Sequence, residues 1–291
     1  LQVREMAAKK SLSTPHALAA CLKNHRTTRD QPLSLGIVHA YSTHNLLLRY
    51  WLATAGLEAG RDVRLSVVPP ARAVEALQSG QIAGFCAGAP WGEIAARAGA
   101  GINIASSDDI WRAAPEKAFA VRATWAQENP AALKGAVRAL GRAAQFCDVP
   151  ENASYTGALL SRQKYLGVDS HAILSSLPGG AIAPDNQSRF WRGAAMFPWR
   201  SHALWFLHQM ARWDLIADID LEAVASRVYR ADLYRASIAS LGVSVPQTDS
   251  KSEGAHTAAW ELQANPKPIA MGPDSFCDGA VFEAVPAKVI F

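Results

Sequence analysis

A histidine and two hydroxyl residues stand at the start of an otherwise apolar segment, YSTHNLLLRYWLATAG, residues 41–56. Ser42 and Thr43 are residue types that cap helix N-termini, and Gly56 is typical of the position after a helix. The first turn of a helix has unpaired N–H groups and a partial positive charge, so His44 at that end predicts a site for a small anion. The alternative is that Ser42 or Thr43 caps the helix and His44 merely packs.

Two further hydrogen-bond donors accompany segments that read as strands. Gly88 lies in the Gly-Ala-Pro turn of QIAGFCAGAPW, residues 81–91, and Lys117 ends WRAAPEK, residues 111–117. Ligands of α/β sheets bind beyond the carboxyl ends of the strands. Because an imidazole, a glycine turn and a lysine can all donate and no paired carboxylates answer them, we expect a site for a small oxyanion. The alternatives are a turn glycine with positive φ and an ordinary surface lysine.

The elements that must position these residues alternate between strand and helix. Short apolar or period-two segments predict strands, and longer segments that end in glycine predict helices. Strands separated by helices of this length favour a parallel α/β sheet. Strands are expected at residues 33–38, 62–68, 102–106 and 117–125, and at the start of the segment 81–91, which ends in a turn. The helices between these strands are expected at residues 43–55, 71–80 and 92–101.

The second half of the chain is richer in helices. Long helical segments are expected at 130–147, 153–166 and 201–216, and the last of these is amphipathic. His202 and Trp199 are expected to anchor the start of that helix. The tail that begins with PQTDSKSEG is rich in Pro, Gly and Asp and is expected to be irregular.

Composition is that of an ordinary globular chain, with 291 residues, 49% hydrophobic and 19% charged. The net charge of +4 is scattered, without the basic run and interleaved aromatic residues of a nucleic-acid groove. The four cysteines have no metal-ligand or disulfide spacing, and no segment resembles a membrane span or a signal peptide. Nucleophile elbows, metal motifs and phosphate loops are also absent from the sequence, so we expect neither an enzyme nor a cofactor.

Five segments together resemble the nitrate/bicarbonate solute-binding proteins of ABC importers. They are STHNLLLRYWLATAG, DVRLSVVPP, GQIAGFCAGAPW, IWRAAPEKAFAVR and PWRSHALWFLHQMARW, and they occur in the family's order. The resemblance is greatest to the branch of cytoplasmic nitrate sensors that control an RNA-binding antiterminator. It implies an α/β, two-lobed periplasmic-binding-protein-like fold of type II with a hinge, an anion in the cleft and a helix-rich C-terminal part.

The resemblance also implies a domain organisation. Residues 1–32 are expected to be a helical remnant of the first lobe or a connector, and residues 33–115 the second α/β lobe. Residues 116–291 are expected to return to the first lobe, with a helical extension and an irregular tail. Family members carry a further N-terminal part that supplies most of the first lobe, so we expect this chain to be N-terminally incomplete.

The anion contacts that the resemblance implies are carried over one at a time. His44 resembles the family's anion-binding histidine, Gly88 its backbone contact and Lys117 its charged contact, whereas Gln2 is a looser match to a glutamine contact. Transporter-like members read GEPWN where this chain has GAPWG, so Ala89 and Gly92 replace an acid and an amide, as in the sensor branch.

Lys117 favours nitrate or nitrite over bicarbonate. Bicarbonate binders carry an acid at this position together with calcium. Nitrate can only accept hydrogen bonds, and a lysine ammonium can only donate them.

The function expected from these residues is binding of nitrate or nitrite, as a nitrate-responsive sensor or as the substrate-binding component of an ABC transporter. The expected partner is an RNA-binding antiterminator in the first case and an ABC permease in the second. The expected location is the cytoplasm, with a periplasmic or membrane-associated location as the alternative. Two alternative functions stay open: binding of bicarbonate or another small solute, and a truncated fragment that does not bind.

Overall fold

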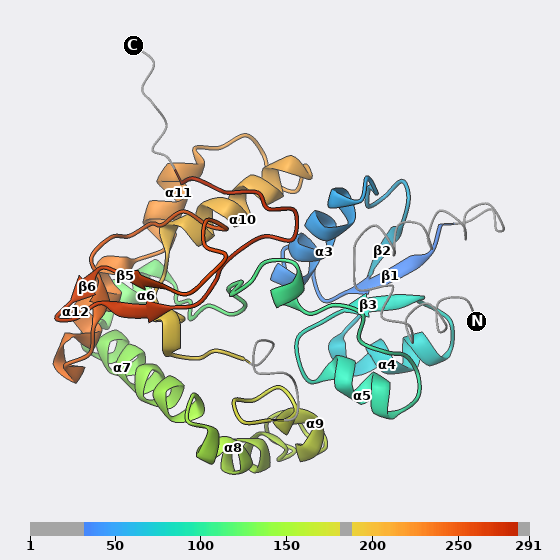
Figure 1. Ribbon diagram of the computed structural model, residues 1–291, viewed down its shortest axis with the longest axis horizontal. Helices are drawn as coiled ribbons and strands as arrows, with labels where there is room; N and C mark the ends of the chain where they lie inside the picture. The colour runs from blue at the N-terminus through green and yellow to red at the C-terminus, as the bar shows by residue number, and fades with distance from the viewer. Residues whose placement is uncertain (1–31, 181–187, 285–291) are drawn as a thin grey trace. The chain divides into compact units, whose positions relative to one another are not determined.

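A computed structural model describes residues 32–180 and 188–284, and it divides into two compact units (Figure 1). Unit 1 is Leu1–Ile110 with Gly157–Ser176, and unit 2 is Trp111–Thr156 with Leu177–Phe291. Each unit is described below by itself. The lobe boundaries expected at residues 32/33 and 115/116 stay predictions, as does the assignment of residues 1–32, nearly all of which lie outside the described range.

Unit 1 contains a three-stranded parallel sheet in the order β2-β1-β3, as expected for a βαβ chain. Gly36 in the central strand is tightly surrounded, because a Cβ there would lie 3.0 Å from Ile82 Cδ1 and 3.1 Å from Phe85 Cβ. The unit contains β1 (Ser34–Ile37), α3 (Thr43–Thr54), β2 (Arg64–Val67), α4 (Pro70–Gln78), β3 (Gly84–Cys86), α5 (Trp91–Arg97), a 3₁₀ turn η1 (Ser107–Asp109) and α9 (Ser170–Leu174).

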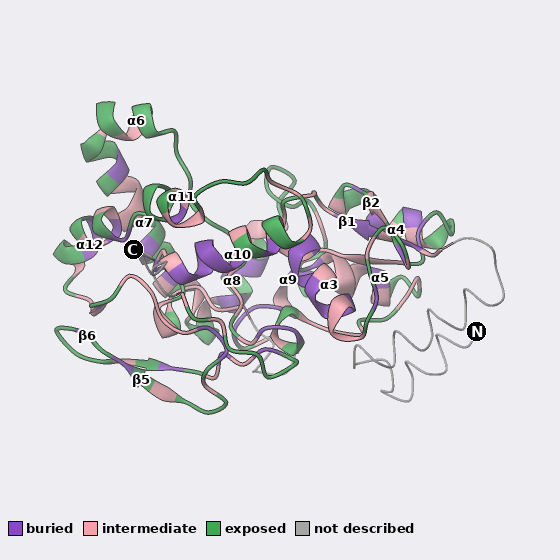
Figure 2. Ribbon diagram, turned by 90° about the horizontal axis from the view of Figure 1, so that it is seen from above, coloured by how far each residue is buried: buried purple, intermediate pink, exposed green. Residues whose placement is uncertain are grey.

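Helix α3 is almost completely buried, as its apolar sequence predicts. Leu46, Leu52 and Trp51 are at most 3% exposed, and the helix shows in Figure 2 as a mixture of buried and intermediate residues. Ser42 is its N-cap, since the Ser42 hydroxyl accepts a hydrogen bond from the Asn45 N–H. The helix therefore presents its N-terminal end at a fixed place beyond β1.

Unit 2 is helical, with two small antiparallel sheets in the tail that the sequence predicted to be irregular. It contains α6 (Ala123–Glu128), α7 (Pro130–Cys147), η2 (Pro150–Asn152), η4 (Arg192–Ala194), α10 (Arg200–Arg212), α11 (Leu221–Val228), α12 (Ala231–Ile238), η5 (Ala239–Leu241), β4 (Val245–Pro246), β5 (Trp260–Leu262), β6 (Ala264–Asn265) and β7 (Ile269–Met271). Helix α8 (Ala153–Leu160) contains the boundary between the two units.

The core of unit 2 is aromatic. Trp111 is fully buried and packs on Trp205 and Phe276, with ring centroids 4.7 and 4.9 Å apart. Trp199 is also buried, at the N-cap position of α10. The expectation that Trp199 anchors the start of this helix is confirmed.

Three element predictions were wrong. Residues 102–106 and 115–122 form neither helix nor strand in the structure, and α8 ends at Leu160 rather than near 166. A strand needs a paired neighbour, and among the described residues the segment 117–122 has none: it is exposed, with Phe119 51% accessible. The apolar residues of this segment therefore predicted a strand, but no neighbouring strand pairs with it among the described residues.

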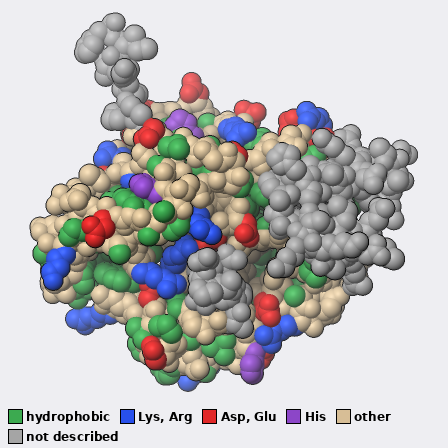
Figure 3. Space-filling model, viewed as in Figure 1, with side chains coloured by type: hydrophobic (Ala, Val, Ile, Leu, Met, Phe, Trp, Pro, Cys, Tyr) green, Lys and Arg blue, Asp and Glu red, His purple; other side chains and the backbone are tan. Residues whose placement is uncertain are grey.

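The described residues contain no helix with the length and apolar character needed to cross a bilayer. Within the same residues, no cluster of His, Cys, Asp and Glu side chains is arranged to hold a metal ion. Acidic and basic side chains are interspersed on the face shown in Figure 3, in line with the scattered charge of the sequence.

Candidate functional site

His44 lies in the first turn of α3, directly after the capping residues. Both of its ring nitrogens are buried, and the first turn of the helix carries no acidic residue. The partial positive charge of the helix end is therefore not neutralised within that turn. His44 has the surroundings that the anion prediction requires.

Asn45, the next residue, fixes the loop that leads into α3. It is fully buried, and its side-chain amide donates to the Ala40 carbonyl at 2.5 Å. Its side-chain oxygen accepts from Arg49 Nε at 3.1 Å. Ser42 Oγ adds a bond to the His39 carbonyl at 2.8 Å. These bonds hold the 39–42 loop against the helix. The sequence did not predict this role for Asn45.

Gly88 follows the neighbouring strand at the same edge of the sheet. Ile37 at the end of β1 is the register partner of Cys86 at the end of β3, so the segments carrying His44 and Gly88 leave adjacent parallel strands. Gly88 is not among the residues with positive φ, which removes the turn-conformation alternative. Its N–H donates to no other residue that the structure describes. This backbone donor is suited to an anion contact.

The strand before Gly88 ends in the half-buried residue Cys86. Burial raises the pKa of Cys86 to about 12, so the thiol is neutral at physiological pH. It brings no negative charge to the end of the strand, where an anion would have to bind.

Gly92, which replaces an amide in the resembling proteins, lies next to the side chain of Asn103. A Cβ at this position would collide with Oδ1 of Asn103. Asn103 is exposed, so its side chain could move aside for a larger residue. In this chain an amide therefore lies against position 92, contributed by a different residue.

Lys117 belongs to unit 2, and its side chain is 76% exposed and forms an ion pair with the adjacent Glu116. The sequence analysis expected no paired carboxylates near the donors and overlooked the single carboxylate of Glu116. The exposed ion pair fits the alternative that Lys117 is an ordinary surface lysine, and its anion contact stays a prediction. Gln2, the fourth predicted contact, lies outside the described residues. The structure thus groups His44 and Gly88 at one sheet edge, with Lys117 in the other unit.

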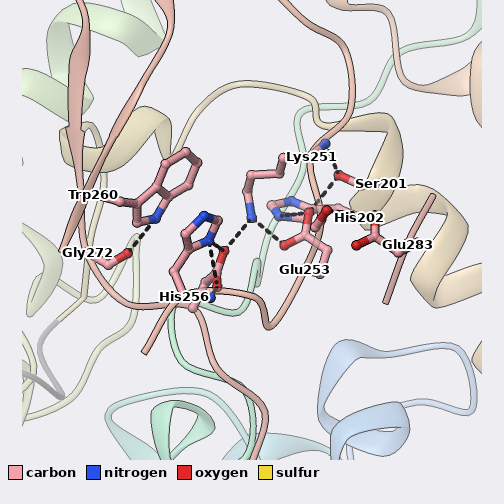
Figure 4. A network of polar contacts seen from close by, with 10 residues as sticks. Ser201, His202, Lys251, Glu253, His256, Trp260, Gly272 and Glu283 are labelled. Atoms are coloured by element: carbon pink, nitrogen blue, oxygen red, sulfur yellow. Dashed lines mark hydrogen bonds and ion pairs between the residues drawn. The ribbon is translucent and has the colours of Figure 1, made fainter. Parts of the chain in front are cut away.

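Unit 2 contains a buried network of charged side chains that the sequence did not predict (Figure 4). Glu253 is fully buried and accepts from the Ser201 hydroxyl at 2.6 Å, with His202 Nε2 at 3.4 Å. The Lys251 ammonium bonds to Glu253 and also to Asp274, at 3.2 Å for the latter. One lysine therefore bridges two buried carboxylates.

The far end of this network is an imidazole stacked on an indole. His256 Nδ1 lies 3.3 Å from the Asp274 carboxylate, and its ring lies 3.9 Å from the Trp260 ring at an interplanar angle of 6°. The Trp260 indole N–H donates to the Gly272 carbonyl at 3.1 Å. Because every charged side chain in the network has an oppositely charged or hydrogen-bonding partner, we assign it to stability.

Electrostatics keep Glu253 ionised. Burial alone raises the pKa of this carboxyl, but the charges of His202 and Lys251 and their hydrogen bonds outweigh burial and lower the pKa to about 2. No local motif could have revealed this arrangement, since Ser201 and Glu253 are separated by 52 positions.

The model of the NMT1-like family matches residues 1–161 of the chain, which is more than half of it. The chain belongs to the NMT1-like family. Within the family it is similar to the nitrate/bicarbonate solute-binding proteins. It is 30% identical to the nitrate/nitrite binding protein NrtA of Synechococcus elongatus over 97% of this chain and 64% of that protein.

Two further relatives extend the comparison. This chain is 37% identical to the bicarbonate transport ATP-binding protein CmpC of Synechococcus elongatus, over 75% of this chain and 33% of that protein. The crystal structure of the periplasmic nitrate-binding protein NrtA from Synechocystis matches 94% of this chain and 69% of its own, at 28% identity and a TM-score of 0.79. The chain thus spans 64% of the Synechococcus NrtA sequence and 33% of the CmpC sequence. Its expected α/β binding-protein fold class is confirmed.

Proposed function

We propose that the chain binds nitrate or nitrite as a solute-binding component, with His44, Gly88 and Lys117 as anion contacts and Gln2 as a fourth. The observation that carries the proposal is that the segments with His44 and Gly88 follow adjacent strands at the carboxyl end of one parallel sheet. The similarity to two nitrate-binding NrtA proteins supports it.

The donor set favours an ion that only accepts hydrogen bonds. A backbone N–H, a helix N-terminus and an ammonium are donors, and the imidazole donates through at least one nitrogen. Nitrate can accept from all of them, whereas the hydroxyl of bicarbonate needs an acceptor. Lys117 can take part only if its ammonium leaves Glu116 for the anion, since the two are paired in the structure.

Bicarbonate is the second candidate, because the 37% identity to CmpC is higher than the 30% identity to NrtA, although over a shorter part of the chain. Glu116, beside Lys117, is the acid that a bicarbonate hydroxyl could use as its acceptor. The donor-only character of the other contacts still favours nitrate or nitrite.

Transporter components are the partners that the relatives favour, because CmpC and NrtC are named as ATP-binding proteins for bicarbonate transport and nitrate import. The antiterminator partner of the sensor alternative is supported by the sequence, through Ala89 and Gly92, and not by the relatives. The expected cytoplasmic location finds no support among the relatives. The NrtA of known structure is described as periplasmic, which favours the periplasmic alternative.

The experiment that tests this proposal is calorimetric titration of the purified protein with nitrate, nitrite and bicarbonate at equal ionic strength. We expect binding heat with nitrate and nitrite and none with bicarbonate. Heat with bicarbonate alone would reject the anion assignment, and no heat with any of the three would support the non-binding alternative. Affinity capture on the immobilised protein then separates permease components from an RNA-binding regulator.

A further inference from the structure

Helix α7 carries a row of basic residues without acidic partners. Lys134, Arg138 and Arg142 are four residues apart, so they lie along one side of the helix. The 18 residues of α7 include no Asp or Glu. None of the three cations forms an ion pair or side-chain hydrogen bond with any residue in the described parts of the chain.

Two other surface helices of this protein neutralise an arginine within the helix. Arg72 pairs with Glu75 on α4 at 2.7 Å, and Arg97 pairs with Glu93 on α5 at 2.7 Å. Spacings of three or four residues between opposite charges are the usual way to stabilise a solvated helix. The row on α7 departs from that pattern within the same molecule.

The side of α7 next to the basic row packs within unit 2. Leu133, Gly141 and Ala144 are buried, and a Cβ on Gly141 would lie 3.0 Å from Ile238 of α12. Lys134 and Arg142 are exposed and Arg138 is half-buried, so another molecule can reach the row within the described part of unit 2.

The face on the other side of the row consists of very small residues. Ala132, Ala139 and Ala143 are exposed, and a Cβ on Gly135 would meet nothing within 4 Å. At the end of the row, Phe146 is 41% exposed and its ring lies 5.7 Å from that of Tyr155. A second helix could approach such a face closely, with its charged side along the basic row and an apolar residue against Phe146.

We propose that α7 is a docking surface for a helix of a partner protein that carries carboxylates at four-residue spacing. Charge complementarity identifies this occupant, because three cations without acids need an anionic partner and four-residue spacing matches a second helix. A symmetric contact between the α7 helices of two copies does not fit, since it would place one basic row against another. This surface is independent of the proposed anion site.

The test uses a labelled, alanine-based helical peptide of about 20 residues with glutamate at every fourth position. Its binding to the whole protein is followed by fluorescence anisotropy at about 0.05 M and 0.5 M salt. We expect binding at low salt, weakened about tenfold or more by R138E/R142E, and weakened less by R138Q/R142Q. R227E on α11 reverses an exposed arginine elsewhere in unit 2 and should leave binding unchanged.

Three outcomes would overturn the proposal. These are no peptide binding at low salt, equal binding by wild type and R138E/R142E, and equal binding of a peptide with lysine in place of glutamate. A further experiment measures binding of the protein to phosphatidylserine vesicles. If the protein binds them through α7 but does not bind the peptide, the surface recognises lipid instead. Circular dichroism melting curves verify that each variant is folded.

Discussion

Glu253 and Ser201 are joined by a 2.6 Å hydrogen bond in the interior of unit 2, where the carboxylate also meets Lys251. This contact links the C-terminal tail to the start of α10. Removing one member of a buried charge network leaves the other charge without compensation, which is more costly than the net value of the pair.

We therefore expect Glu253→Gln to lower the free energy of unfolding by about 3–5 kcal/mol. The matched control is Glu283→Gln, because Glu283 accepts from Ser252 at 2.7 Å on the exposed surface. That change should cost less than about 1 kcal/mol. Urea unfolding of both variants provides the measurement, and equal losses would mean that Lys251 and His202 do not depend on Glu253.

Acid should destabilise the protein through the same carboxylate. The pKa of Glu253 is about 2 in the folded chain, below its ordinary value of 4.5, so the unfolded chain binds the proton first. The contribution is complete above about pH 4.5 and is lost as the pH falls towards 2, and its size is about 3 kcal/mol. Unfolding curves between pH 6 and pH 2 should show this loss in wild type and a smaller loss in Glu253→Gln.

Anion affinity should depend on His44 and Lys117 separately. Loss of one charge-assisted contact costs about 1.5–3 kcal/mol, so His44→Ala and Lys117→Glu should each weaken nitrate binding by roughly one to two decades. Lys267→Glu reverses the charge of another exposed lysine of unit 2 and is the control. Calorimetry that finds unchanged affinity in Lys117→Glu would remove Lys117 from the site and leave its pairing with Glu116 as its role.

Replacing Gly254 by alanine should lower the free energy of unfolding more than the same change at Gly242, a glycine of the same unit. Gly254 has a φ of +84°, and a Cβ there would lie 2.5 Å from the Ala280 carbonyl oxygen and would collide with the Phe276 ring. Gly242 has a φ of +65° but nothing within 4 Å of its Cβ position. Gly242→Ala should therefore cost about 1 kcal/mol from backbone strain, and Gly254→Ala about 2 kcal/mol more. Thermal unfolding of the two variants compares them directly, and equal melting temperatures would show that the tail yields around Gly254.

Local sequence patterns predicted the elements that carry their own signal. The apolar run with its Ser42 cap predicted α3, and the periodic segment 130–147 coincides with α7. The strand predicted at 117–125 was wrong, because strand formation depends on a partner that the segment itself does not reveal.

The candidate site was predictable only in part, for a related reason. His44 and Gly88 follow strands, and the geometry of parallel sheets places them at one edge. The Lys251 network depends on residues brought together from α10 and the tail, and nothing in their local sequence links them. The ion pair of Lys117 with Glu116 was visible in the sequence as adjacent opposite charges and was overlooked.

The bonds of the Asn45 side chain to Ala40 and Arg49 have a kinetic consequence. A loop already fastened to its helix does not have to be ordered when an ion arrives, so little conformational entropy is lost at that step. Capture at the α3 end should then be limited by diffusion and by shedding of the ion's hydration water. Replacing Asn45 by leucine would shift that limit to local ordering of the backbone.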